Sequence, residues 1–221
     1  MTDESETPPD SKLTRSKQRW AREGKFLTGR IARPEEQRLP PGQLLTRDWP
    51  VLDLGLTPEI SHDRWRLDVY GAVDNPVFWT FAEFTAQPQA QFVSDIHCVT
   101  TWSRYDNQWE GLATRELLMA CQPKDDAKFV VLHSYDGYTT NLALEDFAAE
   151  DALLAHRWSG QPIDAEHGGP VRLVVPHLYF WKSAKWLQAI EFLTEDKPGY
   201  WEVRGYHNRG DPWKEERYSG D

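Results

Sequence analysis

Residues 91–103 read QFVSDIHCVTTWS. The first six residues are strand-like and run directly into a histidine and Cys98. A cysteine just past the end of a strand can point into a cleft, where its thiolate serves as a nucleophile or as a metal ligand. Four polar neighbours (His97, Thr100, Thr101 and Ser103) are unusual for a plain core segment. Cys98 is therefore our first candidate functional residue, and the alternative is a buried free cysteine that acts as a small hydrophobe.

The segments around this stretch also predict short elements. Residues 64–70, RWRLDVY, alternate and place Trp65, Leu67 and Val69 on one face of a half-buried strand. Further strands are expected at residues 129–132, 138–142, 171–175 and 186–193, and short helices after Thr80, from a cap at Thr114, and over residues 144–149. Many short strands with a few short helices predict an α+β fold with mixed or antiparallel sheets. No GxGxxG or GxxxxGK[ST] motif occurs, which argues against the common nucleotide-binding architectures.

Composition narrows the class of protein. The 221 residues carry 25 Lys and Arg against 35 Asp and Glu, a formal net charge of −10, which disfavours binding to nucleic acids and to anionic membranes. Two cysteines are too few for a disulfide-stapled secreted domain. The acidic, polar start MTDESETPPD resembles no export signal, and no apolar run is long enough to cross a membrane. We expect a cytoplasmic protein with reduced thiols.

The chain divides into two parts. Residues 1–40 are polar, then basic, then rich in proline, and predict a partly disordered N-terminal arm. Residues 41–221 predict a single domain.

Three later segments also carry candidate chemistry. In HGGPVR, residues 167–172, paired glycines let a ligand approach the backbone and Arg172 needs an anionic partner, although a turn with a buried ion pair is the alternative. Residues 177–186, HLYFWKSAKW, interleave lysines with aromatic rings, which suits a heteroaromatic ligand with a phosphate or else a solvated surface. In HSYDGY, residues 133–138, a hairpin turn explains most of the pattern, and His133 is the part that can reach a site.

Two other chemistries are conceivable at Cys98. A structural zinc cluster lacks its signature, because no CxxC, HxH or HExxH pattern is present. A cysteine hydrolase would pair Cys98 with His133 or His167 in space, but no local hydrolase signature supports it. The cofactor-free alternatives are therefore this hydrolase and a simple binding module.

Together these segments resemble a known family. HCVTTWSRYDNQWEG, SYDGYTTNL, HGGPVRLVVPHLYFWKSAKW and GYWEVRGYHNRGDPW are similar to the molybdopterin-dependent oxidoreductases with the sulfite oxidase fold, which include the catalytic subunit of the protein-methionine-sulfoxide reductase. The resemblance covers about residues 40–213.

The resemblance implies a molybdenum–molybdopterin cofactor and a role for each matching position. Cys98 matches the protein thiolate that binds molybdenum, a role that suits a soft ligand and a redox-active metal. His97, Arg104 and Tyr105 follow this ligand closely in sequence and are expected to shape the substrate pocket. His97 is expected among the cofactor contacts, and Arg104 and Tyr105 are expected as catalytic residues together with Cys98. The remaining expected cofactor contacts are Trp49, Leu52, Asp53, His133 (or Ser134), His167, Arg172, Lys182, Ser183, Ala184 and Lys185.

The expected activity is a two-electron redox step, with oxygen-atom transfer, on a small sulfur-oxo or similar substrate. Sulfite oxidation and sulfoxide reduction both stay open. No haem motif (CxxCH) and no iron–sulfur set of cysteines is present, so an external electron donor or acceptor is the expected partner.

Overall fold

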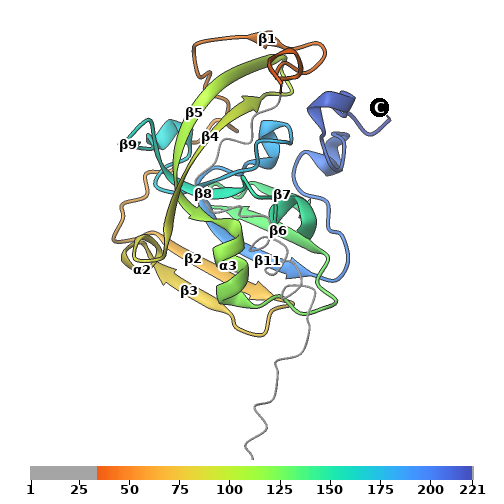
Figure 1. The fold of residues 1–221 in the computed structure, drawn as a ribbon. Helices are drawn as coiled ribbons and strands as arrows, with labels where there is room; N and C mark the ends of the chain where they lie inside the picture. Colours follow the sequence, from red (N-terminus) through yellow and green to blue (C-terminus); the bar gives the residue numbers. More distant parts are fainter. Residues whose placement is uncertain (1–33, 221) are drawn as a thin grey trace, which may run out of the picture.

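The structure, a computed structural model, describes residues 34–220 (Figure 1). The expected N-terminal arm thus lies outside the described residues as far as residue 33. Its last residues contact the body of the molecule, because Arg38 donates to the two carboxylate oxygens of Asp95 at 2.8 and 2.7 Å. A single 3-10 turn, Glu35–Gln37, precedes this contact.

A five-stranded mixed sheet forms one layer. Its strand order is β3-β2-β11-β6-β7, with β2 and β11 parallel and the other pairs antiparallel. The strands are β2 (Arg66–Gly71), β3 (Val77–Thr80), β6 (Phe129–Ser134), β7 (Thr139–Ala143) and β11 (Leu187–Leu193). Trp65, Leu67 and Val69 are each fully buried, which confirms the face predicted from their alternation.

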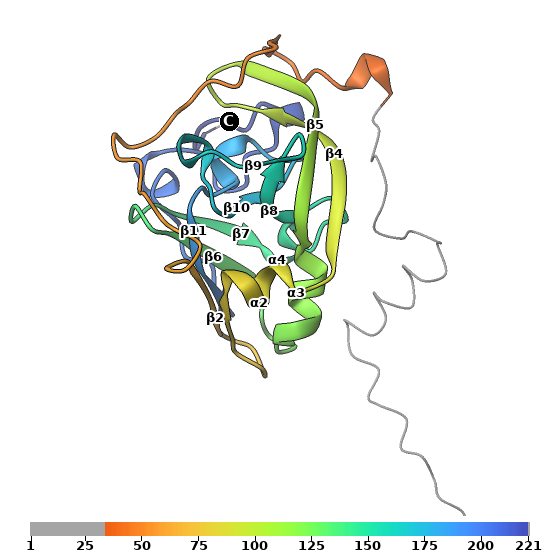
Figure 2. The ribbon, with the colours of Figure 1, turned by 90° about the vertical axis from the view of Figure 1, so that its left-hand side faces the viewer.

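A six-stranded mixed sheet forms the other layer, and a long ribbon of β4 and β5 runs along one side of the molecule (Figure 2). The path β1-β5-β8-β10 is extended by β4 on β5 and by β9 on β8, and only β1 and β5 are parallel among its described pairs. The strands are β1 (Leu44–Leu45), β4 (Gln89–His97), β5 (Trp102–Ala113), β8 (Leu153–Trp158), β9 (Gln161–Pro162) and β10 (Arg172–Val174).

The turn between β4 and β5 places Cys98 at the tip of this ribbon. The Cys98 amide donates to the Trp102 carbonyl at 2.8 Å, and the Thr101 amide donates to the Cys98 carbonyl at 3.1 Å. Thr101 has a φ of 75°, in the left-handed region, which closes the turn within four residues. The cysteine therefore follows the strand directly, as predicted.

In the described part of the chain, three short α-helices connect the strands: α2 (Phe81–Thr85), α3 (Thr114–Cys121) and α4 (Leu144–Phe147). The capping box of Thr80 and Glu83 is present at the start of α2, as predicted. The prediction for α3 was wrong in one respect. Thr114 is its first helical residue instead of its cap, because the hydroxyl donates to the carbonyls of Phe147 and Ala152 across the fold.

Two apolar clusters fill the interior. The larger joins both layers and α3, and includes the fully buried Leu67, Leu117 and Leu173. The smaller lies along β4, β5 and β8, where Phe92 and Trp109 are buried. These layers confirm the α+β class with mixed sheets and short helices. Among residues 34–220, no helix has the length and hydropathy needed to cross a membrane.

Candidate functional site

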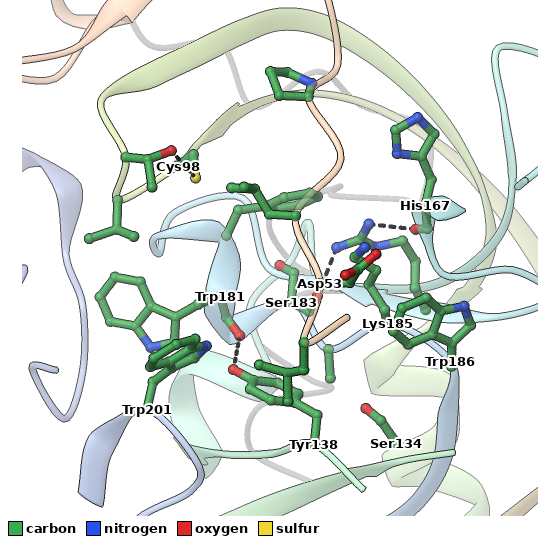
Figure 3. Close-up of a pocket in the computed structure, with 18 of the residues that line it drawn as sticks. Asp53, Cys98, Ser134, Tyr138, His167, Trp181, Ser183, Lys185, Trp186 and Trp201 are labelled. Atoms are coloured by element: carbon green, nitrogen blue, oxygen red, sulfur yellow. Dashed lines mark hydrogen bonds between the residues drawn. The ribbon is translucent and has the colours of Figure 1, made fainter. Parts of the chain in front are cut away.

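A pocket of about 330 Å³ lies where five segments meet. They are the loop that holds Trp49 to Leu54, the turn after β4, the β6–β7 turn, the stretch from His167 to Trp186, and the C-terminal stretch from Trp201 to Tyr206. Figure 3 shows that Cys98 faces Trp181 and Trp201 on one side of the pocket, whereas His167, Lys185 and Trp186 lie on the other. The pocket therefore has two chemically different sides.

The Cys98 side offers a buried thiol. Cys98 is 5% exposed, and its Sγ lies 3.1 Å from the Thr100 hydroxyl. Burial raises the pKa of the Cys98 thiol, so without a further positive charge it stays protonated. Its carbonyl accepts from the Gln43 side chain at 3.1 Å, which holds the turn in place.

The other side contains a buried guanidinium without a carboxylate. Arg172 is 2% exposed and donates to the carbonyls of His167 at 2.7 Å and Ser183 at 2.8 Å. Burial lowers the pKa of Arg172 to about 9, and no described carboxylate pairs with it. The alternative of a buried ion pair is thus not found among the described residues. The described partners of Arg172 are carbonyl oxygens and aromatic rings, with the Phe180 ring centre 4.2 Å from Cζ, so its charge is suited to an anionic ligand.

Lys185 adds a second cation on this side. Its Nζ donates to the Glu166 carbonyl at 2.7 Å and lies 4.7 Å from the centre of the Trp186 ring. Burial, and then the charge of Arg172, lower the pKa of Lys185 to about 8. An anion between the two cations would relieve their repulsion.

The paired glycines pack against the chain itself. A Cβ on Gly169 would lie 2.0 Å from the Ile163 carbonyl oxygen. Gly168 has a φ of 103°, and a Cβ there would lie 2.9 Å from Cα of Lys185. The expectation that these glycines admit a ligand to the backbone is therefore corrected, because their own segment occupies that space.

The loop around Trp49 forms one wall of the pocket. The Trp49 indole stacks on the His167 ring, with centroids 3.9 Å apart and an interplanar angle of 5°. Leu52 and Asp53 follow along the same wall. The predicted residues that line the pocket are Trp49, Leu52, Asp53, Cys98, His167, Arg172, Ser183, Ala184 and Lys185.

Five predicted residues lie outside this lining, and two of them are histidines on strands. His97 is 1% exposed, its Nδ1 lies 2.8 Å from the Ser103 hydroxyl, and its ring packs against Trp213. His133 lies 3.2 Å from the Glu191 carboxylate on the neighbouring strand. Because strand neighbours alternate in direction, Ser134 enters the pocket in place of His133.

Arg104 and Tyr105 are also directed elsewhere. The Arg104 guanidinium lies over the Trp158 ring at 4.7 Å and donates to the Arg47 carbonyl at 3.1 Å. The Tyr105 ring lies under the Arg38 guanidinium at 4.1 Å. The tight turn after Cys98 sends β5 back along β4, so these residues leave the pocket although they follow the thiol closely in sequence.

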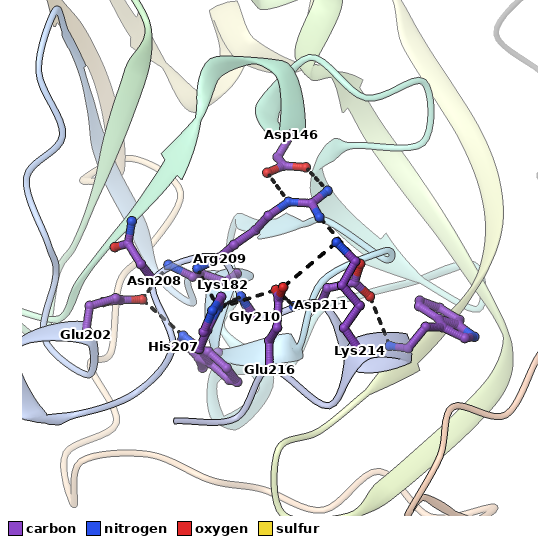
Figure 4. A network of polar contacts seen from close by, with 12 residues as sticks. Asp146, Lys182, Glu202, His207, Asn208, Arg209, Gly210, Asp211, Lys214 and Glu216 are labelled. Atoms are coloured by element: carbon purple, nitrogen blue, oxygen red, sulfur yellow. Dashed lines mark hydrogen bonds and ion pairs between the residues drawn. The ribbon is translucent and has the colours of Figure 1, made fainter. Parts of the chain in front are cut away.

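Lys182, the fifth residue, lies behind the pocket wall. Figure 4 shows it in a polar network with the C-terminal segment, where its Nζ pairs with the Glu202 carboxylate at 2.6 Å. Its ammonium group also donates to the backbone and side-chain oxygens of Asn141 at 2.9 and 3.1 Å. With these partners Lys182 has no direct approach to a ligand in the pocket.

Sequence reasoning missed much of the aromatic lining. Tyr138, Trp181, Trp201 and Tyr206 all line the pocket. The last two belong to the GYWEVRGY stretch, which entered the prediction only through the resemblance. Trp201 and Tyr206 lie five residues apart with Gly205 between them, and this pattern is the one local feature of the sequence that could have indicated their role.

Comparison with known proteins assigns the chain to a family. The profile of the oxidoreductase molybdopterin-binding domain matches residues 54–201.

The chain belongs to this family.

Relatives of the molybdopterin-binding oxidoreductase agree with this assignment. The oxidoreductase YuiH of Bacillus subtilis is 48% identical over 185 residues, which cover 83% of this chain and 93% of YuiH. The protein-methionine-sulfoxide reductase catalytic subunit MsrP of Campylobacter jejuni is 27% identical over 172 residues, 67% of this chain and 56% of MsrP. The chain therefore spans about half of MsrP.

A solved structure shares the fold. The sulfane dehydrogenase SoxCD of Paracoccus pantotrophus superposes with a TM-score of 0.58 at 20% identity, covering 63% of this chain and 40% of the SoxCD chain. The expected family, fold and molybdenum–molybdopterin cofactor are thus confirmed.

The chemistry of the pocket fits such a cofactor. Cys98 offers one soft sulfur donor on one side. On the other side the guanidinium of Arg172, which pairs with no carboxylate of residues 34–220, offers a place for a phosphate. In addition, Ser134 Oγ and Trp102 Nε1 are buried polar atoms of the lining without a hydrogen-bond partner in residues 34–220. Buried polar atoms of this kind are normally satisfied, so a polar ligand is the simplest partner for them.

Proposed function

We propose that this molybdopterin-binding oxidoreductase catalyses a two-electron oxygen-atom transfer on a small sulfur-oxo or similar substrate, with Cys98 as the protein ligand of the metal. One observation carries the proposal: a single pocket holds a buried thiol on one side and a buried guanidinium without a described carboxylate on the other. The cofactor, when bound, supplies the redox chemistry of the metal.

Cys98 would hold the metal through its sulfur. Because burial raises the pKa of the free thiol, a metal cation must replace the proton for the thiolate to form. The Thr100 hydroxyl at 3.1 Å can then donate a hydrogen bond to the thiolate and orient it. The position of Cys98 at the start of the tight turn after β4 would direct the sulfur into the pocket.

The residues of the opposite side would hold the phosphate end. Arg172 and Lys185 neutralise the phosphate charge, and the three carbonyl contacts of Arg172 fix its guanidinium in advance. Ser183 and Ala184 present backbone to the same region, and the stacked rings of Trp49 and His167 would pack against the pterin.

The aromatic residues on the Cys98 side would bind and orient the substrate. Trp181 and Trp201 are large apolar rings that exclude water from this part of the pocket. The Tyr206 hydroxyl has no hydrogen-bond partner in residues 34–220, and burial raises its pKa, so it remains protonated and can donate to a substrate oxygen. Electrons would come from, or go to, an external carrier.

The cofactor-free alternatives find less support. A cysteine hydrolase requires a base that contacts the thiol, whereas the polar contact of Cys98 Sγ is Thr100 and His97 bonds to Ser103. A simple binding module does not explain why one pocket holds both a thiol and an arginine that pairs with no described carboxylate.

Metal analysis tests the proposal. Protein purified from a host that makes the cofactor should contain about one molybdenum per chain, and Cys98→Ser should lose nearly all of it. The matched control is Cys121→Ser, since Cys121 is buried at the end of α3 away from the pocket and should retain the metal. Wild-type protein with neither molybdenum nor pterin would refute the proposal.

Two assays then separate the directions of the reaction. Sulfite oxidation with an artificial electron acceptor and sulfoxide reduction with an artificial donor are measured on the same loaded preparation. Activity that disappears in Cys98→Ser identifies the direction that this site supports.

A further inference from the structure

We infer that the Cys98 side of the pocket selects uncharged substrates with an apolar group, and disfavours inorganic oxyanions. The inference rests on the proposed function, because it assumes that the substrate meets the metal beside Cys98. It concerns the side chains that surround this position.

Aromatic rings face Cys98 on its own side of the pocket, where they form a wall (Figure 3). Trp181 and Tyr206 meet edge to face with centroids 5.1 Å apart, and Trp201 packs on Tyr206 at 4.9 Å. All three line the pocket and keep part of their surface exposed there. Such a wall makes favourable contacts with an apolar substituent, but it offers no positive charge that would compensate for the water lost by a small, strongly hydrated anion.

Contacts from behind hold this wall in place. The Trp181 indole Nε1 donates to the Glu202 carboxylate at 3.0 Å, and the Trp181 carbonyl accepts from the Tyr138 hydroxyl at 2.7 Å. Since both ends of Trp181 are fixed, its ring presents the same face to any substrate. A preformed apolar surface of this kind favours selectivity by shape and polarity.

Positive charge in the pocket is confined to the other side. Among the described lining residues, the lysine and arginine side chains are Arg172 and Lys185, and Arg172 donates to the carbonyl of His167. Figure 3 places His167 and Lys185 across the pocket from Cys98. The cofactor phosphate would occupy these two cations, so they are not available to a substrate anion.

An arginine near the thiol, Arg217, lies outside the lining. It donates to the Val99 carbonyl at 2.6 Å and lies 5.0 Å from the Tyr179 ring centre. It therefore holds the turn from behind the pocket lining, although its charge still acts on Cys98 and lowers the pKa of the thiol against the larger effect of burial. Two carboxylates, Asp53 and Asp136, also line the pocket, and their charges act on Lys185 at the other side. Beside Cys98, an anionic substrate would therefore lose water and find there no lysine or arginine among the described lining residues, with Arg217 acting only from behind the turn.

In the reductive direction, the proposed reaction of a sulfoxide is a two-electron reduction. The S–O bond breaks, the sulfoxide takes up two electrons and two protons, and the products are the sulfide and water. The two electrons come from a reduced external carrier. In the assay, two molecules of a reduced viologen, a one-electron donor, supply them.

A matched pair of probes tests the inference on the holoenzyme. Methyl phenyl sulfoxide and its para-carboxylate differ by one charge on the same ring. Binding is followed by quenching of tryptophan fluorescence, which needs no turnover, and reduction by the viologen is followed separately. We expect the neutral probe to bind at least about tenfold more tightly than the carboxylate, sulfite or nitrate. Equal or tighter binding of the anions would overturn the inference.

Variants locate the selectivity. Trp201→Leu should raise the KM for methyl phenyl sulfoxide about tenfold with little change in kcat, since it removes a stacking surface and no reacting group. Trp201→Arg should narrow or reverse the preference over the carboxylate probe. The matched control is Phe78→Ala, on the exposed face of β3 at 67% exposure. Unchanged discrimination in both Trp201 variants, with circular dichroism showing intact folds, would refute the role of this wall.

These outcomes are distinct from failure of the proposed function. If the proposed function is wrong, the purified protein contains no molybdenum. If only this inference is wrong, the protein contains molybdenum but binds the anions as tightly as the neutral sulfoxide, or more tightly.

Discussion

Lys182 and Glu202 form an ion pair of 2.6 Å in which the side chains are 0% and 2% exposed. The same Glu202 oxygen accepts from Thr140 at 2.9 Å and from Trp181 at 3.0 Å. The pair thus connects β7, the segment after β10 and the C-terminal stretch behind the pocket wall. The sequence predicts that Lys182 contacts the cofactor phosphate. In the structure Lys182 instead pairs with Glu202, the residue that also accepts a hydrogen bond from Trp181 of the pocket wall.

Removal of one partner should destabilise the fold. Lys182→Met leaves the Glu202 carboxylate buried without a counter-charge, and we expect a loss of about 3–5 kcal/mol in the free energy of unfolding. Urea denaturation measures this loss. Lys182→Met with Glu202→Leu should recover much of it. Lys197→Met is the control, because the Lys197 side chain is 58% exposed and its pair with Glu191 contributes little. Equal losses for Lys197 and Lys182 would contradict this view.

Replacement of Arg172 should weaken cofactor retention more than charge alone predicts. Arg172→Lys keeps the charge but loses the planar contacts to three carbonyls. We expect pterin content after gel filtration to fall about tenfold. Arg64→Lys, on an exposed arginine outside the pocket, should retain wild-type content. Full retention in Arg172→Lys would assign the phosphate to other residues.

Stability should fall in acid through Asp146. Burial raises the pKa of Asp146, but hydrogen bonds from His177 and Arg209 outweigh this effect and lower it to about 2. A depressed carboxyl pKa stabilises the folded state above the unfolded value, and this contribution disappears as the pH falls from about 4 towards 2. It amounts to about 2 kcal/mol.

Denaturation midpoints across this pH range measure the effect. Asp146→Asn should be less stable at neutral pH and should show a flatter dependence below pH 4. Asp125→Asn, on an exposed carboxylate, should leave the wild-type curve unchanged. A wild-type slope in Asp146→Asn would show that other groups cause the acid transition.

A methyl group on Gly169 should not be tolerated. Its Cβ would lie 2.0 Å from the Ile163 carbonyl oxygen, so the backbone must shift. We expect Gly169→Ala to lower the free energy of unfolding by about 2 kcal/mol or more and to reduce cofactor content through displacement of Arg172. Gly220→Ala is the control, since a Cβ on Gly220 would meet no described atom within 4 Å. Wild-type melting of Gly169→Ala would contradict the packing role.

Periodic patterns explain what could be predicted. The alternation of Trp65, Leu67 and Val69 was decisive because one face of β2 is buried and the other is not. The spacing of Thr80 and Glu83 was sufficient for α2, since a capping box is a local interaction. Cys98 could be placed because it directly follows a strand.

Orientation explains what could not be predicted. His133 and Ser134 are adjacent, and only the register against β11 determines which of them enters the pocket. Lys182 and Lys185 look equivalent in sequence. However, Lys182 forms an ion pair with Glu202, twenty residues later, and therefore lies outside the pocket lining. The aromatic wall depends likewise on where the C-terminal segment folds back, which short-range patterns do not record.

The turn that carries Cys98 depends on both ends of the described chain. Gln43 and Arg217 donate to the carbonyls of Cys98 and Val99, and the Leu44 amide donates to the Thr101 carbonyl at 2.8 Å. All three donors lie outside residues 54–201, the span of the family match. A fragment trimmed to that span would keep Cys98, the proposed sulfur ligand, and lose the contacts that hold its turn in place. Shortening the chain before residue 45 or after residue 216 is therefore a way to alter the surroundings of Cys98 while every residue of the pocket lining remains in the chain.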